Sequence, residues 1–156
     1  MNDRYLYKAK RTNNGEWIIG NLIIFEGIVY IMEDENTCIR AYYDGGDCVD
    51  FDARAYKVDP STICQYTGLT DKNGKLIWEN DILGRSIYRD KVFGKVVWTN
   101  TGFTGFMLKV PSNSGANFYP MGCGMYDDDD DENERCNDET IGNVFDNPSL
   151  LEGGAE

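Results

Sequence analysis

Residues 63–83 of the 156-residue chain have the sequence ICQYTGLTDKNGKLIWENDIL and carry its strongest local structural signal. Asn73-Gly74 stands between two runs that have the composition of strands, which is typical of a β-hairpin. Both residues accept the positive φ angles that a type I′ turn requires. We therefore expect two antiparallel strands joined by a type I′ turn at this point.

Strand patterns also fill the chain before this hairpin. Apolar and aromatic residues are enriched over residues 4–10, 16–25 and 28–32, and turn residues separate these runs. Gly20-Asn21 inside the second run marks a bulge or a close approach of another backbone segment. The first third of the chain is therefore expected to be a three-stranded meander.

Beyond the hairpin, residues 92–99, 103–110 and 140–145 have strand composition, and residues 149–151 can form one helical turn. Two prolines and three glycines over residues 111–124 predict a loop there. Because no run of ten residues shows clear helical periodicity, the expected fold class is mainly β with little helix. The chain length predicts a single domain over residues 1–156.

The net charge of −12 is concentrated in one segment. Residues 127–139 hold nine acidic residues and one arginine, so this segment contributes −8. We expect residues 126–139 to form a solvated acidic loop. Such a loop could engage a basic protein partner, which makes its acidic run the candidate partner-binding site: Asp127, Asp128, Asp129, Asp130, Asp131 and Glu132.

The sequence contains no histidine, which excludes Ser-His-Asp and Cys-His arrangements and histidine metal ligands. The five cysteines form no C-x-x-C pair, and their odd number favours free thiols in a reducing compartment. We therefore expect no metal, no cofactor and no enzyme. The less favoured alternative is a carboxylate- or metal-dependent enzyme that uses Glu79 and Asp81, which we expect to lie two apart on one strand and therefore to share a face.

A polar start without a long apolar run predicts a cytoplasmic protein with no membrane association. Lys8, Lys10 and Arg11 form the main basic cluster and leave a nucleic-acid-binding barrel open as an alternative, although the overall negative charge disfavours it. Exposed sheet edges also leave self-association open.

Three blocks of this sequence together resemble the YopX family of phage and prophage proteins. The blocks are YKAKR (7–11) with NGEW (14–17) and Gly20; VDPST (58–62) continuing into QYTGLTDKNGK (65–75), Glu79 and DI (81–82); and IGNVFDNP (141–148) with Leu150 and Leu151. They follow the order of the family and cover nearly the whole chain.

The resemblance implies an SH3-like small barrel with additional strands and long loops, and a setting in the cytoplasm of a bacterial host. It implies no biochemical activity. The chain departs from the family pattern at Asn80, where a glycine is usual, and in the length of its acidic run. Asn80 also tolerates the left-handed conformation that such a glycine would adopt. We expect a phage accessory protein that binds a host or phage protein.

Overall fold

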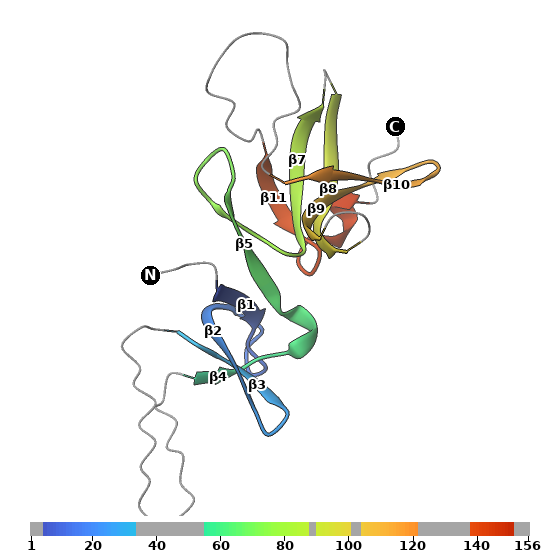
Figure 1. The fold of residues 1–156 in the computed structure, drawn as a ribbon. Coiled ribbons are helices and arrows are strands. Elements are labelled where there is room, and N and C mark those ends of the chain that lie inside the picture. The colour runs from blue at the N-terminus through green and yellow to red at the C-terminus, as the bar shows by residue number, and fades with distance from the viewer. Residues whose placement is uncertain (1–4, 34–54, 88–89, 101–103, 122–137, 152–156) are drawn as a thin grey trace, which may run out of the picture. The chain divides into compact units, whose positions relative to one another are not determined.

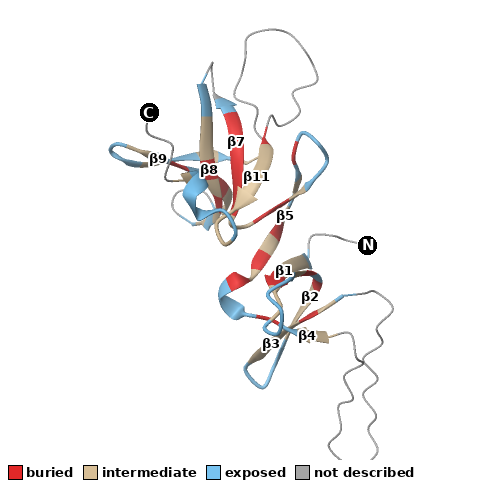
Figure 2. Cartoon of the chain, turned by 180° about the vertical axis from the view of Figure 1, so that it is seen from behind, coloured by how far each residue is buried: buried red, intermediate tan, exposed pale blue. Residues whose placement is uncertain are grey.

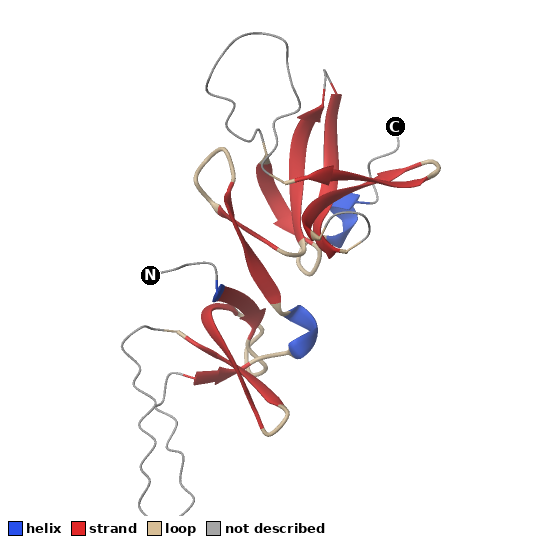
Figure 3. Ribbon diagram, in the orientation of Figure 1, coloured by secondary structure: helices blue, strands red, loops and turns tan. Residues whose placement is uncertain are grey.

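The computed structural model describes residues 5–33, 55–87, 90–100, 104–121 and 138–151 (Figure 1). Strands dominate these residues, and their helical elements are short turns, which confirms the mainly β prediction (Figure 3). The strands are β1 (Leu6–Lys10), β2 (Trp17–Phe25), β3 (Ile28–Met32), β4 (Ala55–Lys57), β5 (Cys64–Thr70), β6 (Leu76–Trp78), β7 (Asp81–Ile87), β8 (Asp90–Thr99), β9 (Gly105–Ser112), β10 (Gly115–Pro120) and β11 (Glu139–Asn143), with the 3₁₀ turns η2 (Pro60–Thr62) and η3 (Pro148–Leu151).

The chain divides into two compact units, Met1–Gln65 (unit 1) and Tyr66–Glu156 (unit 2). The division falls within β5, whose first two residues belong to unit 1 and whose remaining residues belong to unit 2. The family-like blocks of the sequence lie in both units. The single domain over residues 1–156 stays a prediction.

Unit 1 is built on the predicted meander. β2 pairs antiparallel with β1 and with β3, while β4 extends the sheet beside β3 and the start of β5 pairs with β1. One face of this sheet holds a small core of Ala9, Ile18, Ile31 and Val58. The pairing of β2 and β3 leaves no room for a side chain at Gly20, where a Cβ atom would lie 1.9 Å from the carbonyl oxygen of Met32 on β3. The predicted close approach is confirmed.

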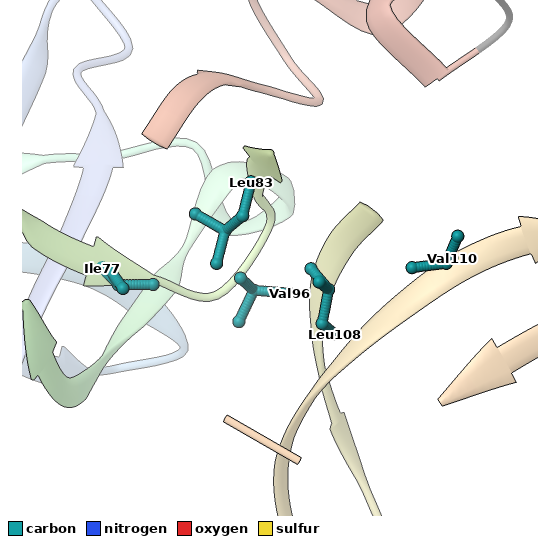
Figure 4. Packing of buried hydrophobic residues seen from close by; sticks show 5 residues of the cluster. All are labelled: Ile77, Leu83, Val96, Leu108 and Val110. Atoms are coloured by element: carbon teal, nitrogen blue, oxygen red, sulfur yellow. The ribbon is translucent and has the colours of Figure 1, made fainter. Parts of the chain in front are cut away.

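Unit 2 contains the β5–β6 hairpin and a five-stranded antiparallel sheet in the order β10-β9-β8-β7-β11. Its core consists of Ile77 from the hairpin and of Leu83, Val96, Leu108 and Val110 from the sheet (Figure 4). The strand composition of each segment explains this core, because alternate residues of β7, β8 and β9 point to the same face. The last predicted strand is confirmed as β11.

The turn between β5 and β6 differs from the prediction. Gly74 has a φ of 81°, but Asn73 is not among the residues with positive φ, so a type I′ turn is wrong. The amide of Gly74 donates to the carbonyl oxygen of Asp71, and the amide of Asp71 donates to that of Lys75. This pattern is a longer turn that closes with a left-handed glycine. The carboxylate of Asp71 favours it by accepting from the amides of Asn73 and Lys75.

The loop predicted over residues 111–124 is wrong for its first ten residues. β9 continues to Ser112, and β10 pairs with it from Gly115 to Pro120. Pro111 fits this strand because it lies beyond the last β8–β9 pair, Lys95–Lys109, where no β8 carbonyl needs its missing amide. A second hairpin therefore replaces the predicted loop.

Strand pairing closes neither sheet into a barrel within the described residues. In unit 1, two contacts connect the residues after β1 to the end of β4 and the residue that follows it. These are an isolated bridge between Arg11 and Val58 and a hydrogen bond from the amide of Thr12 to the carbonyl oxygen of Lys57. A single bridge is not a continuous strand pairing, so the SH3-like barrel stays a prediction.

Candidate functional site

The β2–β3 hairpin of unit 1 ends in a two-residue turn, Glu26-Gly27. The two residues have φ values of 49° and 75°, as both central residues of a type I′ turn require. This conformation suits glycine but is uncommon for glutamate, because a Cβ atom crowds the backbone there. The tight turn brings Phe25 directly opposite Ile28 and Ile24 opposite Val29.

Apolar side chains are exposed at the end of this hairpin. Ile24 is 69% exposed and Phe25 is 38% exposed, and Figure 2 shows the end of the hairpin in the colour of exposed residues. Neighbouring residues of a strand point to opposite faces, so Ile24 and Phe25 make both faces of the ribbon apolar. We call residues 24–28 the hairpin tip. An exposed apolar projection of this kind is typical of a protein-binding surface.

Sequence reasoning missed the hairpin tip, although the sequence contains a signal for it. Leu22-Ile23-Ile24-Phe25 is a continuous apolar run within a strand. A strand that buries one face alternates apolar and polar residues, so a continuous run places apolar side chains on both faces. The core of unit 1 covers Leu22, whereas Ile24 lies nearer the turn and is exposed.

The predicted basic cluster is split between two faces of the sheet. Lys8 and Lys10 lie across from β2, with their Nζ atoms 5.1 and 5.4 Å from the centre of the Trp17 ring. Arg11 instead stacks 3.8 Å from the centre of the Tyr56 ring. One of its nitrogens also lies 3.8 Å from the carboxylate of Glu33. The three cations therefore do not form one patch. The part of the predicted cluster that stays together is Lys8 and Lys10 beside Trp17.

Glu79 and Asp81 do not lie on one strand. β6 ends at Trp78 and β7 begins at Asp81, so Glu79 is in the connecting turn and the predicted shared face is wrong. Asn80 has a φ of 67°, which confirms that it adopts the left-handed conformation. Asp81 is buried and accepts a hydrogen bond of 2.9 Å from the amide of Trp78. Its carboxylate thus stabilises the turn.

The acidic run Asp127 to Glu132 lies outside the described residues, so its role in partner binding stays a prediction. The last two acids of the predicted acidic loop are part of the fold. Asp138 is 0% exposed, and Glu139 begins β11. Lys72 lowers the pKa of Glu139, first through a hydrogen bond of 2.8 Å from its Nζ atom and then through its positive charge. Burial acts in the opposite direction but does not outweigh Lys72.

Asp71 connects the β5–β6 hairpin to β11. Its Oδ1 accepts from the amides of Asn73 and Lys75 at 2.8 and 3.0 Å, and its Oδ2 accepts from the amide of Thr140 at 3.1 Å. Burial by itself raises the pKa of Asp71, but these hydrogen bonds outweigh burial and hold the pKa below its usual value. The carboxylate is therefore kept ionised by the fold that it stabilises.

Within the described residues, no group of three or more His, Cys, Asp or Glu side chains is placed to hold a metal ion. The helices in the same part of the chain are all too short or too polar to cross a membrane. The exposed hairpin tip and the Lys8–Lys10–Trp17 face are two surfaces with a distinct binding chemistry.

Comparison with protein families shows what this chain is similar to. No curated protein matches the chain. A family model described as "YopX protein" matches residues 6–152. This match covers both units and nearly the whole sequence, and it confirms the resemblance carried by the three sequence blocks. The chain therefore belongs to the YopX family.

Proposed function

We propose that this YopX-family protein is a phage or prophage accessory protein that works by binding another protein in the bacterial cytoplasm, without catalysis. The observation that carries the proposal is the hairpin tip, where Ile24 and Phe25 are exposed on opposite faces of one ribbon. A phenylalanine and an isoleucine that enter a pocket together are typical anchors of a protein interface, because desolvating them supplies most of the binding free energy.

The charge of the tip indicates the chemistry of the partner. Glu26 is exposed between the two apolar anchors and Gly27, and the chain as a whole carries −12. A partner with an apolar pocket surrounded by Lys or Arg would complement both features. The acidic run at residues 127–132 would add long-range attraction to the same basic partner, mainly by raising the association rate.

The test is an affinity capture from a lysate of the source cells, with and without nuclease, read by mass spectrometry. We compare the natural chain with Ile24→Asp/Phe25→Asp, and use Phe118→Asp as the matched control. Phe118 is also an exposed aromatic residue on a hairpin, at 44%, but belongs to unit 2. The tip residues are exposed, so circular dichroism should show that all three proteins fold.

We expect the natural chain and Phe118→Asp to retain one stoichiometric protein after nuclease treatment, and the tip variant to lose it. Losing two anchors at about 1–2 kcal/mol each corresponds to a weakening of about 30-fold or more. Undiminished capture by the tip variant would contradict the proposal.

A second candidate function is single-stranded nucleic-acid binding by the Lys8–Lys10–Trp17 face of unit 1. The observation that favours it is the cross-strand placement of Lys10 opposite Trp17 and of Lys8 opposite Ile19, which is exposed. Cations beside an aromatic ring are the usual means of binding a phosphate backbone and stacking its bases. Binding of labelled oligonucleotides that weakens steeply with salt and is lost in Trp17→Ala would support this function. Absence of binding at low salt would exclude it.

A further inference from the structure

Arg85 is a buried cation on the core side of the unit 2 sheet. It follows Leu83 by two residues on β7, so both side chains point to the same face, and Leu83 belongs to the core. On the neighbouring strand it is paired with Val92, which packs against the same core. A guanidinium in such surroundings is stable only if its N–H groups are hydrogen-bonded.

Two segments that are far apart in the sequence supply acceptors for Arg85. Its Nε and Nη2 donate to the two carboxylate oxygens of Asp138 at 2.6 and 2.7 Å. Its Nη1 donates to the backbone carbonyl of Pro120 at 2.9 Å. The fork-shaped contact with Asp138 is the strongest ion-pair geometry that an arginine can make.

Pro120 and Asp138 flank the part of the chain that holds the acidic run. Pro120 is the last residue of β10, and Asp138 immediately precedes β11. One guanidinium therefore holds both residues. A second contact holds Asp138 in place, because the amide of Lys72 donates to its carbonyl oxygen at 2.9 Å.

We propose that Arg85 holds together Pro120 and Asp138, the residues that flank the acidic segment, so that the sheet of unit 2 folds independently of residues 122–137. In this arrangement Asp138 belongs to the core, where its charge is neutralised by Arg85. Residues 122–137 can then change in length and charge without changing the strands on either side. The inference does not depend on the proposed protein-binding function.

The test exchanges residues 122–137 in the full chain for a neutral linker of about eight Gly and Ser residues, which can span up to about 26 Å. Arg85→Met is then introduced into both the natural and the exchanged chain, and thermal unfolding is measured. We expect the exchange alone to move Tm by no more than about 3 °C. We expect Arg85→Met to lower Tm by about 10 °C or more in both chains, because it removes the cation that neutralises the buried Asp138 carboxylate.

Two outcomes would overturn the proposal. One is loss of cooperative unfolding, or of the amide signals of β7 to β11, on exchange of residues 122–137 alone. The other is an unchanged Tm for Arg85→Met in both chains. If Arg85→Met does not fold, Arg85→Met/Asp138→Leu provides the second measurement. Replacing the whole pair with apolar side chains should restore a folded protein that is more stable than Asp138→Leu alone, and failure to do so would also count against the ion pair.

Discussion

Replacing Asp71 tests whether its carboxylate fastens the β5–β6 hairpin to β11. In Asp71→Asn the side chain keeps one oxygen for the amides of Asn73 and Lys75, but its NH₂ group would face the amide of Thr140. In Asp71→Ala all three amides lose their acceptor. Asn73 and Lys75 are exposed and can bond to water, whereas Thr140 is half-buried.

The expected magnitude follows from these contacts. A hydrogen bond to a charged acceptor contributes about 1.5–3 kcal/mol, and an amide that water can reach recovers much of its loss. We therefore expect Asp71→Ala to cost about 2–4 kcal/mol and Asp71→Asn to cost less. With an m value of about 2 kcal/mol/M in urea, the unfolding midpoint of Asp71→Ala should fall by about 1–2 M.

The pH dependence of this loss has a definite sign. The pKa of Asp71 is lowered in the folded protein, so its contribution to stability is present above the pKa of the unfolded chain, about 3.9. The contribution disappears as the pH falls toward the folded-state pKa. The gap in stability between the natural chain and Asp71→Asn should be constant above about pH 5 and close below about pH 4.

Urea unfolding followed by circular dichroism at pH 7 and pH 3 measures both effects, and hydrogen exchange at the Thr140 amide locates them. Asp59→Asn is the control, because Asp59 also has a lowered pKa, caused by hydrogen bonds from Ser61, but lies in unit 1. Protection of the Thr140 amide should fall in Asp71→Asn and be unchanged in Asp59→Asn. Equal stability of Asp71→Asn and the natural chain at pH 7 would refute the reasoning.

Four positions that hold a glycine or have a positive φ give further predictions. Gly20→Ala should destabilise the protein by about 3 kcal/mol or more, because the added Cβ atom would collide with the Met32 carbonyl. Gly27→Ala meets no atom and should cost only about 1–2 kcal/mol, because alanine is strained at a φ of 75°. Thermal unfolding of the two variants separates the two effects. Asn80→Gly should be nearly neutral and Asn80→Ala should cost about 1 kcal/mol in urea unfolding, because φ is 67° there. Glu26→Gly should raise Tm slightly by relieving the left-handed glutamate, and a lower Tm would argue that its side chain stabilises the turn.

Local patterns in the sequence were sufficient for the meander and for most strands. β1, β2 and β3 are short apolar runs separated by turn residues, and consecutive strands of this kind usually pair with each other. The positive φ at Asn80 could also be predicted, since asparagine is one of the few residues that accept it. These features depend on neighbouring residues only.

Turn types were less predictable, because side chains outside the central dipeptide select them. Asn73-Gly74 has the composition of a type I′ turn, but hydrogen bonds to Asp71 stabilise a different one. The dipeptide that does have two positive φ values is Glu26-Gly27, although glutamate is a poor residue for that conformation. The strands on either side determine that turn.

Buried polar contacts between distant residues could not be predicted at all. Asp138 stands in the acidic stretch of the sequence, and it is buried because Arg85, 53 residues earlier, reaches it. The tryptophans illustrate the same limit. Trp78 is buried, whereas Trp98 is mostly exposed and packs edge-to-face on Phe106 at 4.9 Å, although both lie in strands of similar composition.

The most direct measurement of the protein-binding proposal is photo-crosslinking in the source cells, with p-benzoylphenylalanine placed at position 24 or, as the control, at position 118. Both positions carry exposed apolar side chains, but only position 24 belongs to the hairpin tip. We predict one discrete crosslinked protein from position 24 and none from position 118. No crosslink from position 24, or the same products from both positions, would contradict binding by the hairpin tip.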